Sequence, residues 1–378
     1  MKITAIKTFL LQHPMSRPTG PANHYYRTRT TLLIKVETDE GVSGWGETVA
    51  FVGVRNLIEE QYAPFLIGRS PLAQRENDRA LWGQNFGNGM AIGGLSIALD
   101  DLRGKALGLP VAEIYGGRLR DRVPAYASAM NYIEGEDPAD YYPREAKELA
   151  AQGFRAMKMR IGGQSIAKDL AAATAVRAAV GPDVKLMADG NGAYSLGTAI
   201  TMGRELEKLG YYWFEEPLPQ NAPNYAGYEV LTEKLDIPIA ACEGLTSRSM
   251  FRDAIARRAM AIMQPDVALA GGIGECLFVA EMARLSGIQC MPHCWAGGLV
   301  IAASVHLLSL LPDASWGRHT ETPMLELDRV ENPFREEIFN ATVEIKNGFA
   351  TVPTKPGLGV EVNEAALTSF IQQRHDRN

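Results

Sequence analysis

The sequence has little cysteine, no long apolar run and no excess of basic residues. Four cysteines in 378 residues do not make a disulfide framework, and they favour a reducing compartment. The longest apolar stretch, residues 297–305, is far shorter than the ~18 residues that span a bilayer. Residues 1–13 lack the uninterrupted apolar core of a signal peptide. We therefore expect a cytoplasmic protein without a membrane partner.

The charge balance of the chain is mildly acidic. The 38 Lys and Arg against 44 Asp and Glu give a formal charge of −6 at pH 7, whereas nucleic-acid-binding proteins usually carry a basic excess. Hydrophobic residues make up 46% of the chain and charged residues 22%, which excludes a largely disordered protein. Small molecules are therefore the expected partners, and nucleic acid is not.

Residues 1–122 show strand patterns followed by helical patterns. Strands are predicted over residues 3–11, 30–38 and 42–47, with a hairpin turn at Asp39-Glu40-Gly41. The Pro-, Gly- and aromatic-rich residues 14–27 predict a loop. Helices are predicted over residues 54–66, 72–82 and 93–107. Strands followed by helices indicate an α+β unit.

From residue 123 onward, short apolar runs alternate with amphipathic helical patterns. The predicted strands are residues 123–128, 156–161, 184–188, 211–214, 237–241, 261–263 and 288–291, with a weaker one at residues 314–317. Seven or eight βα units within residues 123–324 indicate a (β/α) barrel or a doubly wound sheet, and their number favours the α/β TIM-type barrel. Residues 325–378 do not continue the repeat, and we expect them to pack back on the N-terminal unit.

Acidic residues follow three successive predicted strands, where the loops of a barrel build its active face. Asp189, Glu215 and Glu243 are separated by 26 and 28 residues, about one βα unit each. One such acid alone would more often cap the helix that follows it. Three brought together by adjacent strands repel one another unless a cation compensates them, and hard oxygen ligands suit Mg²⁺. The pattern therefore predicts a magnesium site facing Lys158 and Arg160.

A histidine and an aspartate follow the next two strands. His293 lies 27 residues after Asp266, which is again about one βα unit. An Asp that accepts a hydrogen bond from one imidazole nitrogen fixes the tautomer and makes the other nitrogen more basic. The pair therefore predicts a general base. Glu321 follows the weak eighth strand, and His319 beside it could line the site.

Two weaker patterns point to other kinds of site. Cys242, Cys290 and Cys294 lie near Glu243 and His293 and could suggest zinc, but they contain no C-x₂-C pair, so core packing is favoured. The run Gly271-Gly272-Ile273-Gly274 lacks the full G-x-G-x-x-G of a dinucleotide loop. A nicotinamide oxidoreductase therefore has little support.

Taken in order, these motifs resemble the enolase superfamily, mandelate racemase subgroup, over nearly the whole chain. Gly44-Trp45-Gly46-Glu47 is similar to the hairpin of that family's capping domain, so residues 1–122 and 325–378 are expected to form such a domain. The motifs that carry the resemblance are Lys158-Met159-Arg160, Asp189, Glu215, Glu243, Gln264-Pro265-Asp266 and Pro292-His293.

The resemblance implies a reaction and a set of roles. It implies Mg²⁺ held by Asp189, Glu215 and Glu243, a carboxylate substrate that chelates the metal, and abstraction of the proton α to that carboxylate. It implies that Glu321 hydrogen-bonds the far side of the carboxylate and that Asn191 contacts the substrate. The capping loop is expected to set specificity, with His24 and Tyr25 as its candidate contacts.

Arg160 departs from the family pattern, which is Lys-x-Lys with the second lysine as a base. Arginine holds its proton more tightly, with a pKa of ~12.5–13.8 against ~10.4 for lysine, and it is better suited to clamping a carboxylate or hydroxyl. A racemase needs a base on each face of the substrate, and this sequence offers one good base, His293. We therefore rank racemisation low. A dehydratase needs only one, if His293 also protonates the departing β-hydroxyl.

We predict a Mg²⁺-dependent acid-sugar dehydratase, a lyase that acts through an enediolate. A lactone cycloisomerase of the galactarolactone type is the alternative, because residues 264–335 look similar to that family, and Lys158 could then serve as a second acid. An epimerase and a non-catalytic sugar-acid binding protein are further alternatives. Members of this family often form higher oligomers, so a homo-oligomer is expected.

Overall fold

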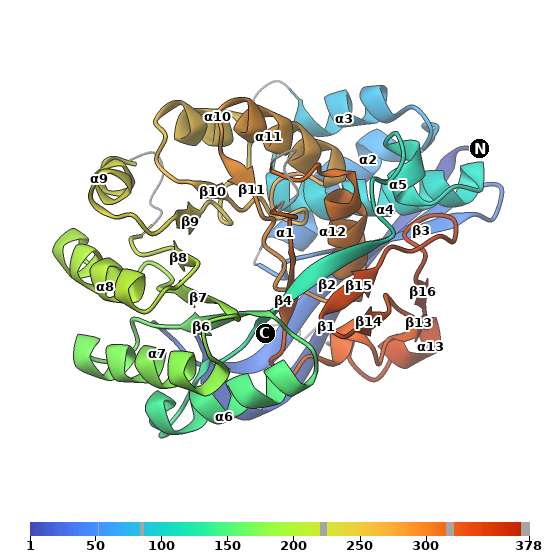
Figure 1. Cartoon of the computed structure of the whole chain (residues 1–378). Coiled ribbons are helices and arrows are strands. Elements are labelled where there is room, and N and C mark those ends of the chain that lie inside the picture. Colours follow the sequence, from blue (N-terminus) through green and yellow to red (C-terminus); the bar gives the residue numbers. More distant parts are fainter. Residues whose placement is uncertain (52, 84–86, 220–224, 315–320, 372–378) are drawn as a thin grey trace, which may run out of the picture.

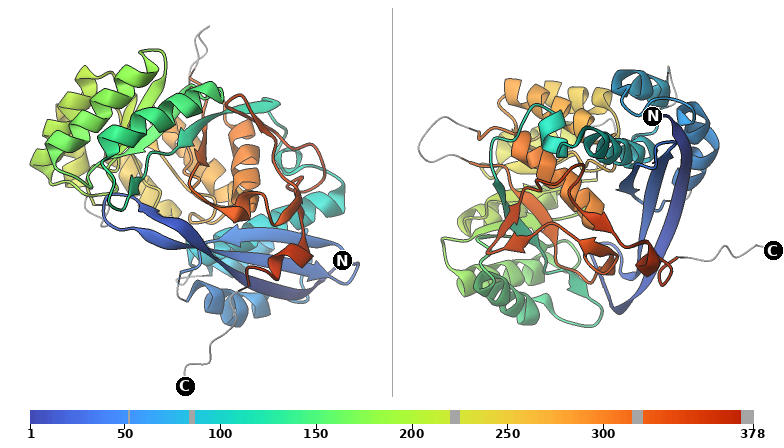
Figure 2. Two further views of the ribbon diagram at one scale, coloured as in Figure 1. Left: turned by 90° about the horizontal axis from the view of Figure 1, so that it is seen from below. Right: turned by 90° about the vertical axis from the view of Figure 1, so that its right-hand side faces the viewer.

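The computed structural model describes residues 1–51, 53–83, 87–219, 225–314 and 321–371. An antiparallel sheet with its helices comes first along the chain, and a ring of parallel strands and outer helices follows (Figure 1). The C-terminal segment returns to lie beside both (Figure 2). The predicted TIM-type barrel with a capping domain is therefore confirmed.

The cap is built from three long strands and a layer of helices. The strands are β1 (Ile3–Gly20), β2 (Tyr26–Thr38) and β3 (Ser43–Thr48), which pair in the order β3-β2-β1. The helices are α1 (Val54–Asn56), the π-helix η1 (Leu57–Tyr62), α2 (Ala63–Leu66), α3 (Gln74–Trp82), α4 (Gly89–Leu107) and α5 (Val111–Ile114). One apolar cluster joins β1 and β2 to all of these helices except α5, as the alternating and helical sequence patterns predict.

The predicted loop over residues 14–27 is wrong for its first half. β1 continues to Gly20 through a register shift between Pro14 and Thr19, and only residues 21–25 connect it to β2. The shift accommodates residues that break a regular ladder. Beyond it, Thr19 and Gly20 pair with β5 (Tyr132–Ile133), which belongs to the barrel segment. The cap hairpin therefore reaches over the barrel.

In the part of the chain that the structure describes, eight parallel strands form the barrel. They are β4 (Arg122–Ser128), β6 (Ala156–Arg160), β7 (Lys185–Asp189), β8 (Trp213–Glu215), β9 (Ile239–Ala241), β10 (Ile262–Met263), β11 (Gln289–Cys290) and β12 (Leu325–Asp328). The helices between them are α6 (Pro138–Ala151), α7 (Ile166–Val180), α8 (Leu196–Lys208), α9 (Ala226–Lys234), α10 (Arg248–Ala256), α11 (Ile273–Leu285) and α12 (Gly298–Leu310).

The interior of the barrel is closed by one apolar cluster. Each of the eight strands, or a residue next to it, contributes one member: Tyr126, Ala156, Met187, Trp213, Ala240, Ile262, Met291 and Met324. Between β11 and β12 the contact includes the Met324 N–H, 3.3 Å from Met291 Sδ. Such a filled interior is expected of an eight-stranded barrel. It leaves the carboxyl ends of the strands as the place for polar side chains.

The eighth strand is not where the sequence pattern placed it. Of residues 314–317, the last three lie outside the described part of the chain, and the parallel partner of β4 is β12. The predicted boundary at residue 324 therefore cuts off a strand that is hydrogen-bonded into the barrel sheet.

The rest of the C-terminal segment contacts both parts of the molecule. It contains η2 (Pro333–Arg335), β13 (Phe339–Ala341), β14 (Ile345–Lys346), β15 (Phe349–Thr351), β16 (Glu361–Val362) and α13 (Glu364–Leu367). β15 pairs antiparallel with β4, whereas the Gln12 N–H donates to the Phe370 carbonyl in the cap. The division into three domains stays a prediction.

A buried glutamate joins the cap to the barrel. Glu47 on β3 accepts hydrogen bonds from Thr31 Oγ1 at 2.8 Å and from the Gly297 and Val300 N–H groups at 2.8 and 3.3 Å. These amides open α12, where a negative charge is favourable. A Cβ on Gly297 would lie 2.4 Å from Glu47 Oε1, so this close approach requires glycine.

A buried histidine on the same helix ties three segments together. His306 Nδ1 accepts from the Ala112 N–H at 3.2 Å, and Nε2–H donates to the Leu358 carbonyl at 3.2 Å. Burial lowers the pKa of His306 to about 4, so the neutral ring is the stable form at neutral pH.

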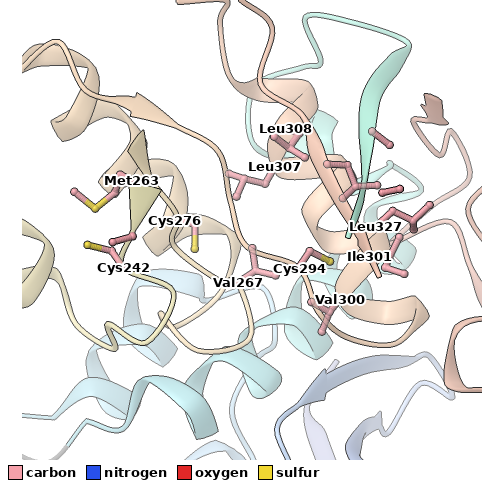
Figure 3. Close-up of a cluster of buried hydrophobic side chains, with 14 of the residues drawn as sticks. Cys242, Met263, Val267, Cys276, Cys294, Val300, Ile301, Leu307, Leu308 and Leu327 are labelled. Carbon is pink, nitrogen blue, oxygen red and sulfur yellow. The ribbon is translucent and has the colours of Figure 1, made fainter. Parts of the chain in front are cut away.

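The cysteines lie in the core, as the sequence predicts. Cys242, Cys276 and Cys294 are buried among Met263, Val267, Leu307 and other apolar side chains (Figure 3), and Cys290 is partly buried against the same cluster. These four cysteines, all in the described part of the chain, form no disulfide bond. Within the described ranges, the helices are too short or too polar to cross a membrane.

Candidate active site

A cavity of about 260 Å³ lies where the carboxyl ends of the barrel strands meet the cap. Both parts of the molecule line it. The cap contributes Tyr26, Arg29, Thr31 and Glu47, and the barrel contributes Asn131, Arg160, Asn191, Glu243, Asp266, His293 and Trp295, among others. In a barrel this end of the strands is where active sites sit.

Strand register places the first charged residues in one row. Arg160 on β6 is paired with Asp189 on β7, and Asp189 is paired with Glu215 on β8. The Arg160 guanidinium donates to the Asp189 carboxylate and, at 3.0 Å, to Asn191 Oδ1. Since Lys158 lies two residues before Arg160, it faces the same side of the strand. The Lys-x-Arg pair therefore meets the acids, as predicted.

Lys158 is buried among three carboxylates. Its Nζ contacts Glu215 Oε1, Glu326 Oε1 at 2.8 Å and Asp189 Oδ2 at 3.3 Å. Burial alone would lower the pKa of Lys158, but these carboxylates outweigh burial and hold its pKa above the usual value. Lys158 therefore keeps its proton in this arrangement.

The backbone is strained next to each of the three predicted metal ligands. Asn191 has φ 43°, Glu216 has φ 40° and Cys242 has φ 94°. These residues follow Asp189, follow Glu215 and precede Glu243. Left-handed backbone at a non-glycine residue is uncommon and costs about 1–3 kcal/mol, and such strain gathers at functional sites. The strained backbone at the ends of β7, β8 and β9 therefore indicates a functional site.

Negative charge exceeds positive charge around these strand ends. Lys158 and Arg160 face a set of six carboxylates, of which Glu243 is partly exposed and the others are buried: Asp189, Glu215, Glu216, Glu243, Asp266 and Glu326. Burial, with Asp189 and Glu326 nearby and Lys158 opposing, raises the pKa of Glu215 to about 7. A further cation would relieve this repulsion.

The donor set suits a hard divalent cation, although the side chains as placed make ion pairs instead. Asp189, Glu215 and Glu243 offer only oxygen ligands at adjacent strand ends, which is the chemistry that Mg²⁺ prefers. Both oxygens of Glu215 are engaged, one by Lys158 and the other by Trp213 Nε1 and Gln264 Nε2 at 2.8 and 2.9 Å. Among the residues that the structure describes, no three His, Cys, Asp or Glu side chains already surround a metal position.

The predicted histidine–aspartate pair is brought together. His293 Nδ1–H donates to Asp266 Oδ2 at 2.6 Å, and Asp266 Oδ1 accepts from the Ala268 N–H at 2.7 Å. His293 Nε2 lies 3.4 Å from Glu243 Oε2 and 3.8 Å from Glu326 Oε2. Burial alone would lower the pKa of His293, but these carboxylates raise it well above the usual value. Asp266 thus fixes the ring, and Nε2 is left at the cavity.

The position expected for Glu321 needs correction. Its side chain is exposed and accepts from Gln289 at the amino end of β11, which is the opposite end of the barrel from the cavity. Glu326 on β12 occupies the site instead, where it contacts Lys158 and accepts from the Cys294 N–H at 3.0 Å. The alternation Leu325-Glu326-Leu327, with a charged residue between two buried leucines, was the available signal.

Of the three residues predicted to contact the substrate, only one lines the cavity. Asn191 lines the cavity, but His24 and Tyr25 do not, and Tyr26 takes their place. The Tyr26 ring packs on Trp295 with centroids 5.1 Å apart, and the His24 ring lies behind Tyr26 at 4.3 Å. Tyr25 is 38% exposed. His319 lies outside the described residues.

Comparison with protein families identifies the chain. Residues 5–116 match the N-terminal domain of mandelate racemase / muconate lactonizing enzyme, and residues 142–366 match the enolase C-terminal domain-like family. The chain belongs to the mandelate racemase / muconate lactonizing enzyme family of the enolase superfamily. It is an enzyme, and membership of this superfamily implies a divalent metal.

Relatives of this family member act on sugar acids according to their names. The chain is 34% identical to D-galactarolactone cycloisomerase of Agrobacterium fabrum, over 98% of this chain and 99% of that one. It is 32% identical to arabinonate dehydratase of Saccharolobus solfataricus, over 90% of each. The solved structure of 3,6-anhydro-D-galactonate cycloisomerase from Zobellia galactanivorans superposes with a TM-score of 0.87 at 31% identity, covering 99% of this chain and 100% of that one.

Proposed function

We propose that this family member catalyses Mg²⁺-dependent removal of the proton α to the carboxylate of a sugar acid, with dehydration as the overall reaction. The observation that carries the proposal is the pair of His293 and Asp266 at 2.6 Å, beside the carboxylates at the ends of β7 to β9. Relatives named as arabinonate and galactonate dehydratases support the substrate class.

Each side chain has a task that its contacts support. Mg²⁺ bound by Asp189, Glu215 and Glu243 would supply positive charge to the substrate carboxylate as a second negative charge develops on it. Mg²⁺ at these ligands would offset the negative charge that raises the pKa of His293, and the neutral ring, with its proton held on Nδ1 by Asp266, would take the α-proton at Nε2.

The cationic side chains complete the site. Lys158 and Arg160, held by their ion pairs with Glu326 and Asp189, place fixed positive charge beside the position proposed for the substrate carboxylate. His293, once protonated, gives its proton to the departing β-hydroxyl, which is lost as water.

The pairing of both basic side chains on β6 supports a one-base reaction. The Arg160 guanidinium is engaged by Asp189 and Asn191, and Lys158 by three carboxylates. Neither is placed to accept a proton, so a second base for racemisation is lacking among these groups.

Cycloisomerisation of a sugar-acid lactone is the second candidate. It also begins with α-proton removal, and two relatives carry cycloisomerase names. Here the protonation that completes the reaction would require one more acid. Lys158 is the candidate because it carries a proton, but the carboxylates that raise its pKa also make it a weak acid.

Exchange of the α-proton tests the shared step. The purified chain with Mg²⁺ is incubated in ²H₂O with sugar acids and their lactones, and α-deuteration is followed by NMR. His293→Asn is expected to abolish exchange, whereas His13→Asn, a matched change at a partly exposed histidine that pairs with Glu331, is expected to keep it. Ligand binding without exchange would favour the non-catalytic sugar-acid binding protein.

Product mass distinguishes the two reactions, since dehydration loses water and cycloisomerisation leaves the mass unchanged. Metal binding is tested separately, by titration calorimetry of the chain with MgCl₂. Glu215→Gln is expected to weaken Mg²⁺ binding at least about tenfold, because it removes a charged ligand. The cytoplasmic location and the homo-oligomer stay predictions, and sedimentation velocity measures the second.

A further inference from the structure

Several buried hydrogen-bond donors around the cavity have no partner. Within the described part of the chain, Arg29 Nη1, Asn131 Nδ2, Trp295 Nε1 and Arg160 Nε are buried and unpaired, and all four residues line the same cavity. Buried donors are nearly always satisfied, so a group of orphans is unusual. All four are donors, and their common complement is a ligand rich in acceptor oxygens.

Three of these residues belong to other elements than the acids at the ends of β7 to β9. We call Arg29, Asn131 and Trp295 the cap-side donors. Arg29 lies on β2 of the cap, Asn131 follows β4 and Trp295 follows β11. The Arg29 guanidinium stacks on the Trp295 ring, with Cζ 3.5 Å from the ring centroid. The stack fixes a rotamer-rich side chain, which lowers the entropy lost when a ligand binds.

The charge of Arg29 is only partly compensated. Its Nη2 donates to Asp328 Oδ2 at 2.8 Å, but Arg335 Nη1 contacts the same oxygen at 3.1 Å. One carboxylate is therefore shared by two guanidinium groups. The charge of Glu47 also acts on Arg29, but Glu47 accepts its hydrogen bonds from Thr31 and from the amides that open α12, so it leaves Arg29 Nη1 without a partner.

We propose that the cap-side donors bind a second carboxylate of the substrate, so that the substrate is a sugar diacid, an aldarate. This inference rests on the proposed function, which accounts for the first carboxylate. A buried cation that shares its one carboxylate partner and has an unpaired N–H favours an anion, because a hydroxyl would satisfy the hydrogen bond but add no negative charge. Tyr26, stacked on Trp295, forms the cavity wall beside this second position.

Matched pairs of acids test the inference. Galactarate and galactonate differ only at the far carbon, as do glucarate and gluconate, so each pair isolates the second carboxylate. For the Mg²⁺-loaded chain, calorimetry gives the Kd of each acid and α-proton exchange gives kcat/KM. We expect at least one aldarate to be preferred over its aldonate by about tenfold or more in both, as a charge-assisted pair implies.

Substitution of Arg29 tests whether it is the source of the preference. Arg29→Gln is expected to reduce the preference to within about threefold, with a loss on the aldarate of about 10- to 100-fold. Asp328 keeps Arg335 as a partner in this variant, so the acid is not left alone. Arg27→Gln is the matched control, because it changes an exposed arginine of the same strand that pairs with Glu134 and does not line the cavity. It is expected to keep the preference.

A conservative variant guards against misfolding. Arg29→Lys keeps the charge and is expected to keep a reduced preference even if the glutamine variant proves unstable by circular dichroism. Trp295→Phe keeps a ring beneath Arg29 but removes Nε1, and it is expected to weaken aldarate binding less than Arg29→Gln.

The outcomes separate this inference from the proposed function. Exchange of aldonates as fast as aldarates by the unaltered chain would overturn the second-carboxylate site and leave the proposed function intact. Arg29-dependent binding of aldarates without exchange would support the site and refute the function. Equal losses on both classes of acid in Arg29→Gln would show a structural role and overturn the inference.

Discussion

Replacement of Asp266 by Asn should stop His293 from acting as a base while leaving the histidine in place. In the unaltered chain Asp266 accepts from His293 Nδ1–H and from the Ala268 N–H. Asparagine has nearly the same size, and its oxygen can keep the contact with Ala268. Its NH₂ group then faces Nδ1 and can only donate. The stable tautomer becomes the one with the proton on Nε2, so the atom that must accept the α-proton is already occupied.

The expected loss follows from comparing two effects. Removing one nearby negative charge would lower the pKa of His293, and the rate would fall as the base becomes weaker. A wrong tautomer costs about 10⁴-fold in a histidine–aspartate pair of serine proteases. We therefore expect Asp266→Asn to reduce α-proton exchange by about 10³-fold or more, equivalent to about 4 kcal/mol.

The assay is α-proton exchange, measured for each single variant and for the double variant with His293→Asn. Because the two residues act as a unit, the double variant is expected to be no slower than His293→Asn alone. Melting temperatures show whether each variant is folded. A loss below about tenfold in Asp266→Asn, or losses that multiply in the double variant, would refute the argument that the aspartate acts through the histidine.

Three further predictions concern other parts of the molecule. The folded state holds the pKa of His306 near 4, below the unfolded value of 6.5, so its contribution is complete above pH 6.5 and is lost as the pH falls towards 4. Denaturant titrations should show about 3 kcal/mol of acid-dependent stability that is missing in His306→Asn. Gly297→Ala should destabilise the chain by about 1–3 kcal/mol through the 2.4 Å approach to a carboxylate oxygen. Gly197→Ala, in a helix with open space, should have the opposite sign, by up to about 1 kcal/mol. Glu326→Gln should slow α-proton exchange at least about 100-fold, because it removes a charged hydrogen bond at the site. The same change at the exposed Glu321 should alter the exchange rate by no more than about twofold. Equal effects of the two variants would contradict the assignment of Glu326, in place of Glu321, to the site.

The sequence was sufficient for the regular parts of the fold. Strands of period two and helices of period 3.6 carry their own signal, so seven barrel strands and the cap helices lie close to their predicted ranges. The same regularity placed Asp189 and Glu215 side by side, since each ends a strand and neighbouring strands are parallel. Their roles as metal ligands stay a prediction.

The errors occur where local pattern carries little information. The sequence pattern predicts a weak eighth strand at residues 314–317, with Glu321 as the acid that follows it, whereas the structure has the strand at Leu325–Asp328 with Glu326 at the site. Pairing with β4, about 200 residues earlier, decides the matter. The extension of β1 to Gly20 likewise depends on its pairing with β5. Such long-range pairing follows from tertiary contacts that a single segment does not record.

Arg29 could not have been found from its own neighbourhood. It stands between the loop predicted over residues 14–27 and the strand predicted over residues 30–38, where charged and polar residues alternate and nothing local indicates burial. Instead it is 4% exposed, because Trp295 covers it and Asp328 pairs with it. Both partners come from the barrel, more than 260 residues further along the chain. The burial of Arg29 in the cap therefore depends on side chains of the barrel.

The distribution of buried charge links the metal to the substrate. Carboxylates exceed cations at the ends of β7 to β9, whereas at Arg29 two guanidinium groups share Asp328. Uncompensated buried charge is costly, so each end of the cavity favours a ligand of opposite sign. A divalent cation alone would offset the excess of negative charge at the ends of β7 to β9 and would leave the excess of positive charge at Arg29. A diacid with one carboxylate on the metal and the other on Arg29 would relieve both, which is why a chain with a net charge of −6 can still select a dianion.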